Sequence, residues 1–301
     1  MSALHHVLAS LVALFWAAAY FSTQTLYDCG VGPFAVLILK AVLAYGLLIL
    51  IAPKRIYAGS IKAEVKCMLL GVTFVPLYGG LTNLALAHGQ AANTAVILAT
   101  GPLLGVLIAS AVLSRVKMHW TTWLGLCSAA TGVILTVIDG EILHDLSGTA
   151  DLLAMGAALS WALYALVLHR LRTVPPALAA RKCLGWGILA AMPFYFMEEP
   201  TEVLSLTDPV VIGNLLFLSW GAMAAGLVLW HRVIAVIGAK AANYWHYLTP
   251  FAAILIGGFF FEEQMSFIGL MGAGLTVCGL ILGQRGVNAA NRDAARRRQA
   301  A

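Results

Sequence analysis

Residues 89–102 read GQAANTAVILATGP, and residues 239–250 read AKAANYWHYLTP. In each stretch the tripeptide Ala-Ala-Asn opens an apolar run, and a proline follows: Pro102 in the first copy and Pro250 in the second. The copies begin 150 positions apart, at residues 89 and 239 of a 301-residue chain. A duplicated half-chain built from apolar runs is typical of membrane transporters with internal repeats.

The amino-acid composition indicates an integral membrane protein. Hydrophobic residues are 61% of the chain and charged residues 10%, whereas a soluble domain carries about 25% charged residues. The five cysteines have neither CxxC nor metal-ligand spacing, so we expect inert packing cysteines and neither a metal nor a cofactor. Although the net charge is +5, its distribution between loops indicates membrane topology, and we expect no nucleic-acid partner.

Ten apolar windows have the length of membrane spans. A transmembrane helix needs about 20 apolar residues, and the chain offers such windows at residues 4–26, 32–52, 67–87, 92–113, 121–138, 150–169, 177–197, 210–230, 241–261 and 267–284. We therefore predict an all-α integral membrane protein with ten transmembrane helices.

Charged residues in the loops orient these spans. Lysine and arginine follow every even-numbered window, for example Lys54 and Arg55 after the second, whereas the alternate loops contain only acidic charges, such as Glu198 and Glu262. Because loops rich in Lys and Arg stay in the cytoplasm, we predict that both termini are cytoplasmic. The expected location is the inner membrane of a bacterial cell, crossed many times.

Further matches extend the duplication over the whole membrane region. Trp16 corresponds to Trp161, Lys40 to Lys182, and the pair Gly125/Gly132 to the pair Gly272/Gly279. Each half holds five spans, an odd number, so the second copy must be inverted in the bilayer. We predict a first five-helix repeat over 1–140, a second inverted repeat over 141–285 and a basic tail over 286–301. That tail is expected either to rest on anionic headgroups or to remain disordered.

On these residues the sequence resembles the drug/metabolite transporter superfamily, in particular its ten-helix EamA-type branch. The resemblance covers roughly residues 4–284 and rests on the midspan tryptophans, the Pro-then-cation pattern of spans two and seven, Ala-Ala-Asn followed by proline, and Phe261-Glu262-Glu263 before the glycines of the last hairpin. It implies a secondary transporter that exports small organic metabolites by alternating access about a midplane cavity. Within the branch the chain looks similar to aromatic amino acid exporters of the YddG type, which implies neutral or aromatic amino acids as substrates. Drugs, nucleobases and other metabolites remain alternatives.

The candidate site consists of polar and aromatic side chains within or beside the spans. A lysine at the centre of a membrane helix costs roughly 2.5–3.5 kcal/mol to insert, so Lys40 needs a partner or an aqueous cavity. Lys40 is expected to bind a substrate carboxylate or to act as a gating residue. Alternatively, its ammonium could snorkel to the membrane surface or donate to carbonyls at a helix end. The predicted substrate-binding residues are Trp16, Tyr20, Lys40, Tyr78, Asn83, Trp161, Tyr164, Tyr244, His246 and Tyr247.

The two prolines and two asparagines of the duplicated stretches have structural interpretations. Proline within a membrane helix frees a carbonyl, so Pro102 and Pro250 are predicted to kink their helices and widen the midplane. Asn93 and Asn243 are predicted to cap helix starts. The glycine pairs are expected to be helix-packing surfaces.

Other functional classes lack their motifs. The chain has no HExxH, no GxSxG and no cluster of intramembrane acids, so we expect no enzyme. It also lacks a GxxxxGK[ST] phosphate loop, and one asymmetric pair of halves does not form the charged rings of a channel. Transport would then use a substrate gradient, exchange or protons, with His246 or Lys40 as the hypothetical proton carrier. We expect a small-molecule substrate, a bilayer environment, and a monomer or homodimer.

Overall fold

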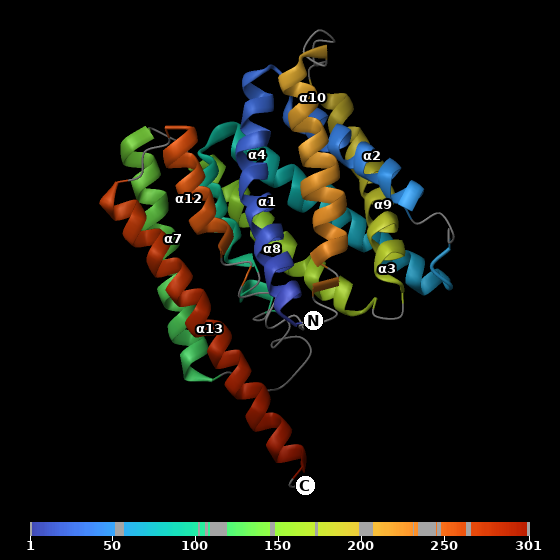
Figure 1. Ribbon diagram of the computed structural model, residues 1–301. Coiled ribbons are helices and arrows are strands. Elements are labelled where there is room, and N and C mark those ends of the chain that lie inside the picture. Colours follow the sequence, from blue (N-terminus) through green and yellow to red (C-terminus); the bar gives the residue numbers. More distant parts are fainter. Residues whose placement is uncertain are drawn as a thin grey trace.

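The structure is a computed structural model that describes residues 2–51, 57–101, 103–105, 108, 119–144, 148–171, 174–198, 207–230, 232–233, 245, 248–262 and 266–299. Every element in these ranges is helical (Figure 1), as the apolar windows predict. The helices are α1 (Ser2–Asp28), α2 (Pro33–Ile51), α3 (Ile61–Val72), η1 (Thr73–Gly80), α4 (Leu81–His88), α5 (Ala91–Leu98), α7 (Trp120–His144), α8 (Thr149–His169), α9 (Pro176–Met197), α10 (Pro209–Leu216), η3 (Phe217–Ala225), α12 (Leu248–Phe260) and α13 (Phe267–Gln299). Each of the ten predicted windows overlaps helix in the described residues, and three of the windows, 32–52, 92–113 and 241–261, are described only in part.

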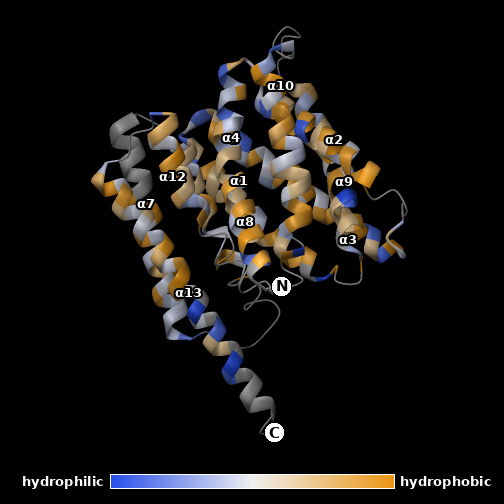
Figure 2. Cartoon of the chain, in the orientation of Figure 1, coloured by the Kyte–Doolittle hydropathy of each residue, from blue (hydrophilic) through white to orange (hydrophobic). Residues whose placement is uncertain are grey.

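Six helical runs in the described residues are long and apolar enough to cross a bilayer: Leu4–Asp28, Pro33–Ile51, Ile61–His88, Thr149–Leu168, Pro209–Trp230 and Phe267–Ala290. Shorter apolar helices cover Ala91–Gly105, Trp120–Leu135 and Leu248–Phe260. The helix α9, in the seventh window, carries Arg181 and Lys182 near its start. Large apolar side chains such as Leu50, Met197 and Phe259 are about four-fifths exposed, and apolar residues cover the outside of the bundle in Figure 2. Such a surface suits acyl chains rather than water.

Local signals in the sequence explain several helix starts. Ser60 caps α3 by accepting the N–H of Ala63 at 3.2 Å, and Asp208 caps α10 by accepting the N–H of Val210 at 2.7 Å. Pro33 and Pro209 are first helical residues, where the missing proline N–H breaks no intrahelical bond. One capping prediction is wrong. Gln90 is the N-cap of α5, and Asn93 lies buried in its first turn.

The two halves of the chain interdigitate instead of forming separate bodies. The closest packing joins helices of different halves: α7 with α13, α3 and α2 with α9, α4 with α8, and α1 with α12. Because each half supplies faces that the other half covers, the centre of the bundle is built jointly by both.

Glycines allow α7 and α13 to pack closely, as the sequence predicts. A Cβ atom on Gly132 would overlap Gly272 and Thr276, and one on Gly279 would overlap Gly125 and Ala129. The contact is self-complementary and antiparallel, because the equivalent glycines of the two repeats exchange partners: Gly125 meets Gly279 while Gly132 meets Gly272. A twofold relation between equivalent helices produces this pattern.

The basic tail continues α13 without a break. The helix extends to Gln299, past the predicted boundary at residue 285, so of the two alternatives predicted for the tail the disordered one is wrong. Residues 286–301 are rich in alanine and arginine, which are strong helix formers. Both chain ends lie at the lower side of the molecule in Figure 1, where the end of α13 projects beyond the other helices.

Candidate functional site

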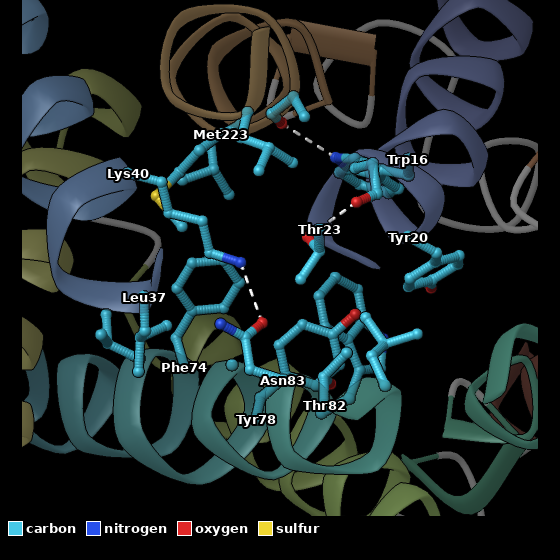
Figure 3. A pocket seen from close by; sticks show the side chains of 18 residues that line it. Trp16, Tyr20, Thr23, Leu37, Lys40, Phe74, Tyr78, Thr82, Asn83 and Met223 are labelled. Atoms are coloured by element: carbon cyan, nitrogen blue, oxygen red, sulfur yellow. Dashed lines mark hydrogen bonds between the residues drawn. The ribbon is translucent and has the colours of Figure 1, made fainter. Parts of the chain in front are cut away.

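A cavity of about 100 Å³ lies at the centre of the bundle, where helices from both halves meet. The first half contributes α1, α2, η1 and α4, and the second half contributes α8 and η3 (Figure 3). The cavity is lined by Trp16, Ala19, Tyr20, Thr23, Leu37, Lys40, Phe74, Val75, Tyr78, Gly79, Thr82, Asn83, Leu86, Trp161, Leu218, Ala222, Met223 and Leu227. Most of these side chains are apolar, so the polar groups among them determine how a ligand would be oriented.

Two π-helical turns form part of the wall, one in each half. The turn η1 belongs to the third helix of the first half, and η3 belongs to the third helix of the second half. Pro76 lies inside η1, where it has no N–H to donate and so interrupts regular α-helical bonding. π-helical turns are frequent at functional sites because they redirect the side chains beside them.

Aromatic rings cover one side of the cavity. The ring centre of Trp161 lies 5.0 Å from that of Tyr78, 5.4 Å from that of Tyr164 and 6.1 Å from that of Trp16. These distances are in the range where aromatic rings attract one another beyond their apolar burial. Trp16 is fixed further by its indole Nε1, which donates to the carbonyl of Ala222 at 3.0 Å.

Lys40 and Asn83 form the polar side of the cavity. The Lys40 Nζ atom donates to Asn83 Oδ1 at 3.0 Å, and Asn83 Nδ2 donates to the carbonyl of Pro33 at 2.8 Å. Because the Asn83 amide is held by Pro33, its oxygen faces the lysine. Figure 3 shows the ammonium pointing toward Asn83, with Trp16 and Tyr20 on the opposite side.

The described residues place no carboxylate within 4.0 Å of the Lys40 ammonium; the ion pair that they contain joins Lys182 Nζ to Glu64 Oε1 at 2.8 Å, elsewhere in the bundle. An ammonium has three N–H donors, and Asn83 accepts from one of them. The arrangement therefore offers a positive charge and donors to a negatively charged group in the cavity.

Hydroxyl groups add further polar atoms. Thr82 is 6% exposed, and its Oγ1 has no hydrogen-bond partner among the described residues. Tyr20 and Tyr78 each bring a hydroxyl-bearing ring to the cavity wall. A buried hydroxyl without a partner is costly, so the Thr82 oxygen is suited to bind a polar group of a ligand.

The structure brings together six of the ten residues predicted to bind substrate: Trp16, Tyr20, Lys40, Tyr78, Asn83 and Trp161 all line the cavity. Tyr164 does not line it and lies behind, packed against Phe74 and Trp161. Three more, Tyr244, His246 and Tyr247, lie outside the described residues, as does Pro102.

Pro250 is buried as the third residue of α12. At that position its missing N–H interrupts no bond of the described helix. Pro76, in contrast, lies inside the helical turn η1 at the cavity, and it was not among the prolines predicted to kink a helix.

Several cavity residues carried no recognisable signal in the sequence. Thr23, Phe74, Thr82 and Met223 resemble many other residues of an apolar chain. Pro76 was a usable signal, because a proline inside an apolar window marks a place where helical bonding is interrupted.

Comparison with known proteins identifies the family. The model of the EamA-like transporter family matches residues 4–138 and, a second time, residues 148–283. The chain belongs to the EamA-like transporter family. The predicted resemblance is confirmed, and the chain is a multi-span membrane transporter rather than an enzyme.

Two relatives are bacterial. An uncharacterized transporter of Bacillus subtilis, YyaM, is 24% identical over 225 residues, which are 73% of this chain and 73% of the relative. A probable terminal-alkyne amino-acid exporter of Streptantibioticus cattleyicolor is 24% identical over 239 residues, 77% of this chain and 75% of the relative. A crystal structure with a TM-score of 0.64 and 17% identity covers 94% of this chain and 98% of its own, which shows a shared fold.

Proposed function

We propose that this EamA-like carrier exports small organic metabolites that bear a carboxylate, above all neutral and aromatic amino acids. The observation that carries the proposal is the Lys40 ammonium, which faces an aromatic cavity and has Asn83, a neutral partner, in place of a carboxylate. A charged group in a membrane interior needs compensation, and the carboxylate of a substrate would supply it.

The remaining groups of an amino acid also find suitable surroundings. An apolar or aromatic side chain would lie against Trp16, Tyr78 and Trp161. The α-ammonium would be attracted to the faces of these rings by cation–π interaction and would donate a hydrogen bond to the Thr82 oxygen. The relative named a probable terminal-alkyne amino-acid exporter supports this class of substrate.

The alternative substrates fit the cavity less well. A cationic drug would be repelled by Lys40, which lacks a neutralising acid among the described residues. A neutral nucleobase would stack on the aromatic wall but would leave the charge of Lys40 uncompensated.

Alternating access follows from the relation between the halves. The self-complementary antiparallel contact of α7 and α13 supports an inverted repeat with its twofold axis in the membrane plane. Rocking of one half against the other would expose the central cavity to each side in turn. With the positive loops inside, the carrier resides in a bacterial inner membrane, as a monomer or homodimer, with both termini cytoplasmic.

Counterflow in proteoliposomes tests the proposal. Vesicles preloaded with single unlabelled amino acids should accumulate labelled phenylalanine when loaded with Phe or Trp, and not when loaded with Glu. Lys40→Gln should reduce this exchange about tenfold or more, since a charge-assisted hydrogen bond contributes about 1.5–3 kcal/mol. Lys40→Arg should retain exchange.

A matched control is Lys66→Gln. Lys66 lies outside the cavity and donates to the carbonyl of Arg170 at 3.3 Å, so its removal should leave exchange intact. Exchange with nucleobases or cationic drugs, and with no amino acid, would overturn the substrate assignment while leaving the fold unaffected.

A further inference from the structure

A second concave surface lies on the outside of the bundle, between α2 and α9. It is a groove of about 600 Å³ lined by Val42, Tyr45, Ile49, Arg181, Lys182, Gly185, Trp186, Ile188 and Leu189. None of these side chains lines the central cavity. A ligand in this groove would therefore be distinct from the transported substrate.

The groove opens toward lipid. Leu189 is 64% exposed and Val42 is 46% exposed, both on helices whose outer surface is apolar. Tyr45 lies close to the backbone of α9, because a Cβ on Gly185 would be 3.3 Å from its ring. The missing side chain at Gly185 thus deepens the groove along its length.

One end of the groove is basic and the other is apolar. Arg181 and Lys182 come five and six residues after the start of α9 at Pro176, about 8–9 Å along a helix that rises 1.5 Å per residue. Leu189 is about 10 Å further on. Since α9 begins after the basic loop of the sixth window, the basic end belongs to the predicted cytoplasmic side, where membranes carry anionic lipids.

Two cations and one carboxylate lie near the basic end, so its net charge is positive. The Lys182 ammonium is paired with Glu64, whose carboxylate also accepts the N–H of Ala58 at 2.9 Å and the indole N–H of Trp186 at 3.5 Å. Of the described residues that line the groove, none is acidic. Arg181, 6% exposed, adds a second positive charge with a planar guanidinium that suits phosphate geometry.

We propose that the groove between α2 and α9 binds one anionic phospholipid of the cytoplasmic leaflet. The lipid phosphate lies against Arg181 and Lys182, and an acyl chain follows Val42, Ile188 and Leu189 toward the middle of the bilayer. Tyr45 and Trp186 occupy the level between them, where amphipathic rings are favoured. Because α2 carries Lys40 and joins α9 across the two halves, a lipid at this site would bridge the moving parts of the carrier.

Native mass spectrometry of the purified full chain in detergent tests the site. Titration with dioleoyl phosphatidylglycerol should give one bound lipid with about tenfold higher affinity than dioleoyl phosphatidylcholine, since each basic residue contributes about 1 kcal/mol at such a surface. Arg181→Gln should lower the phosphatidylglycerol affinity about fivefold and reduce the preference over phosphatidylcholine. Arg181→Lys and the control Lys66→Gln, which alters a cation outside the groove, should keep the preference.

Two further measurements test the site even if Arg181→Gln fails to fold. Leu189→Asn places a polar amide at an exposed position where the lipid acyl chain is proposed to lie. It should weaken the binding of phosphatidylglycerol and phosphatidylcholine equally. Glycerol 3-phosphate should not compete, because it lacks the acyl chains.

Four results would overturn the proposal. The first three are equal binding of the two lipids, an unchanged preference in folded Arg181→Gln, and displacement of the lipid by glycerol 3-phosphate. The fourth is a covalent dimer formed through the variant Ile49→Cys, which would show that a second copy of the chain occupies the groove.

Discussion

Glu198 Oε1 accepts the backbone N–H of Phe34 at 2.9 Å, so the end of α9 in the second half is hydrogen-bonded to the first turn of α2 in the first half. Its Oε2 accepts the N–H of Ala35 at 2.8 Å. The carboxylate satisfies two of the free N–H groups at the start of α2 and complements the positive end of the helix dipole. Gly32 makes room for it, because a Cβ there would lie 2.5 Å from Glu198 Cδ.

Glu198→Ala should destabilise the carrier by about 1–2 kcal/mol, the usual effect of removing a helix cap. Thermal unfolding of the purified protein in detergent measures this change. Asp208→Ala is the matched control, since Asp208 caps α10 within one half by accepting the N–H of Val210. Both variants should lose stability, whereas a changed exchange rate is expected from Glu198→Ala, which breaks a link between halves. Equal transport effects of the two would show that the link does not act in transport.

Asn83→Asp should impair substrate binding while leaving the protein folded. The new carboxylate would pair with the Lys40 ammonium, now 3.0 Å from the Asn83 oxygen, and would repel the carboxylate of an amino acid. Like charges in close contact cost several kcal/mol, so KM for counterflow should rise at least about tenfold. Asn214→Asp is the control, because Asn214 accepts from Ser22 at 2.6 Å and does not line the cavity. An unchanged KM in Asn83→Asp would contradict the assignment of Lys40 to the substrate.

Trp161→Leu should reduce the preference for aromatic over aliphatic amino acids. Trp161 lines the cavity and contacts Tyr78 and Trp16, and an aromatic pair contributes about 0.5–1.5 kcal/mol, or about twofold to tenfold in the ratio of kcat/KM values. Trp123→Leu changes a tryptophan that is 55% exposed and should leave the ratio unchanged. Competition assays with phenylalanine and leucine supply the ratio. If both variants kept the wild-type ratio, Trp161 would be assigned to packing alone.

Gly279→Ala should destabilise the contact of α7 with α13. A Cβ there would overlap Ala129 and Gly125, and overpacking of this kind costs about 1–3 kcal/mol. Gly274→Ala, on the same helix, has nothing within 4 Å of the added Cβ and should be neutral or slightly stabilising. Thermal unfolding of the two variants side by side checks the difference. Equal midpoints would show that the helices can separate at no cost.

Much of the fold could be predicted because the bilayer restricts what a chain can do. Backbone groups in hydrocarbon must be satisfied within a helix, so apolar windows predict helices directly. The midspan tryptophans and Lys40 were recognisable for the same reason, since neither the interfacial belt nor apolar packing explains them. Asn83 was among the predicted substrate-binding residues, and in the structure its side-chain oxygen accepts a hydrogen bond from Lys40.

Other parts of the site could not be predicted. Threonine and phenylalanine also occur at positions that face lipid or pack in the core, so residue type alone does not mark Thr82 and Phe74 as cavity residues. Their place in the cavity wall depends on how the helices pack together. The pairing of Lys182 with Glu64 joins residues 118 positions apart, from 64 to 182. The prediction that Asn93 caps a helix start was wrong, because the backbone is extended at Gly89 and Gln90 and the helix α5 already begins after Gln90.

Sequence alone determined the class of the protein, the approximate positions of its helices and the existence of two repeats, because these depend on the solvent that each segment faces. Tertiary structure decided which faces meet. It placed Lys40 opposite Asn83, and it brought Glu198 to the start of α2. In this chain, positions in the core, positions facing lipid and positions in the cavity are all mostly apolar, so residue type does not distinguish these three environments. Only the packing of the helices against one another decides which environment each residue occupies.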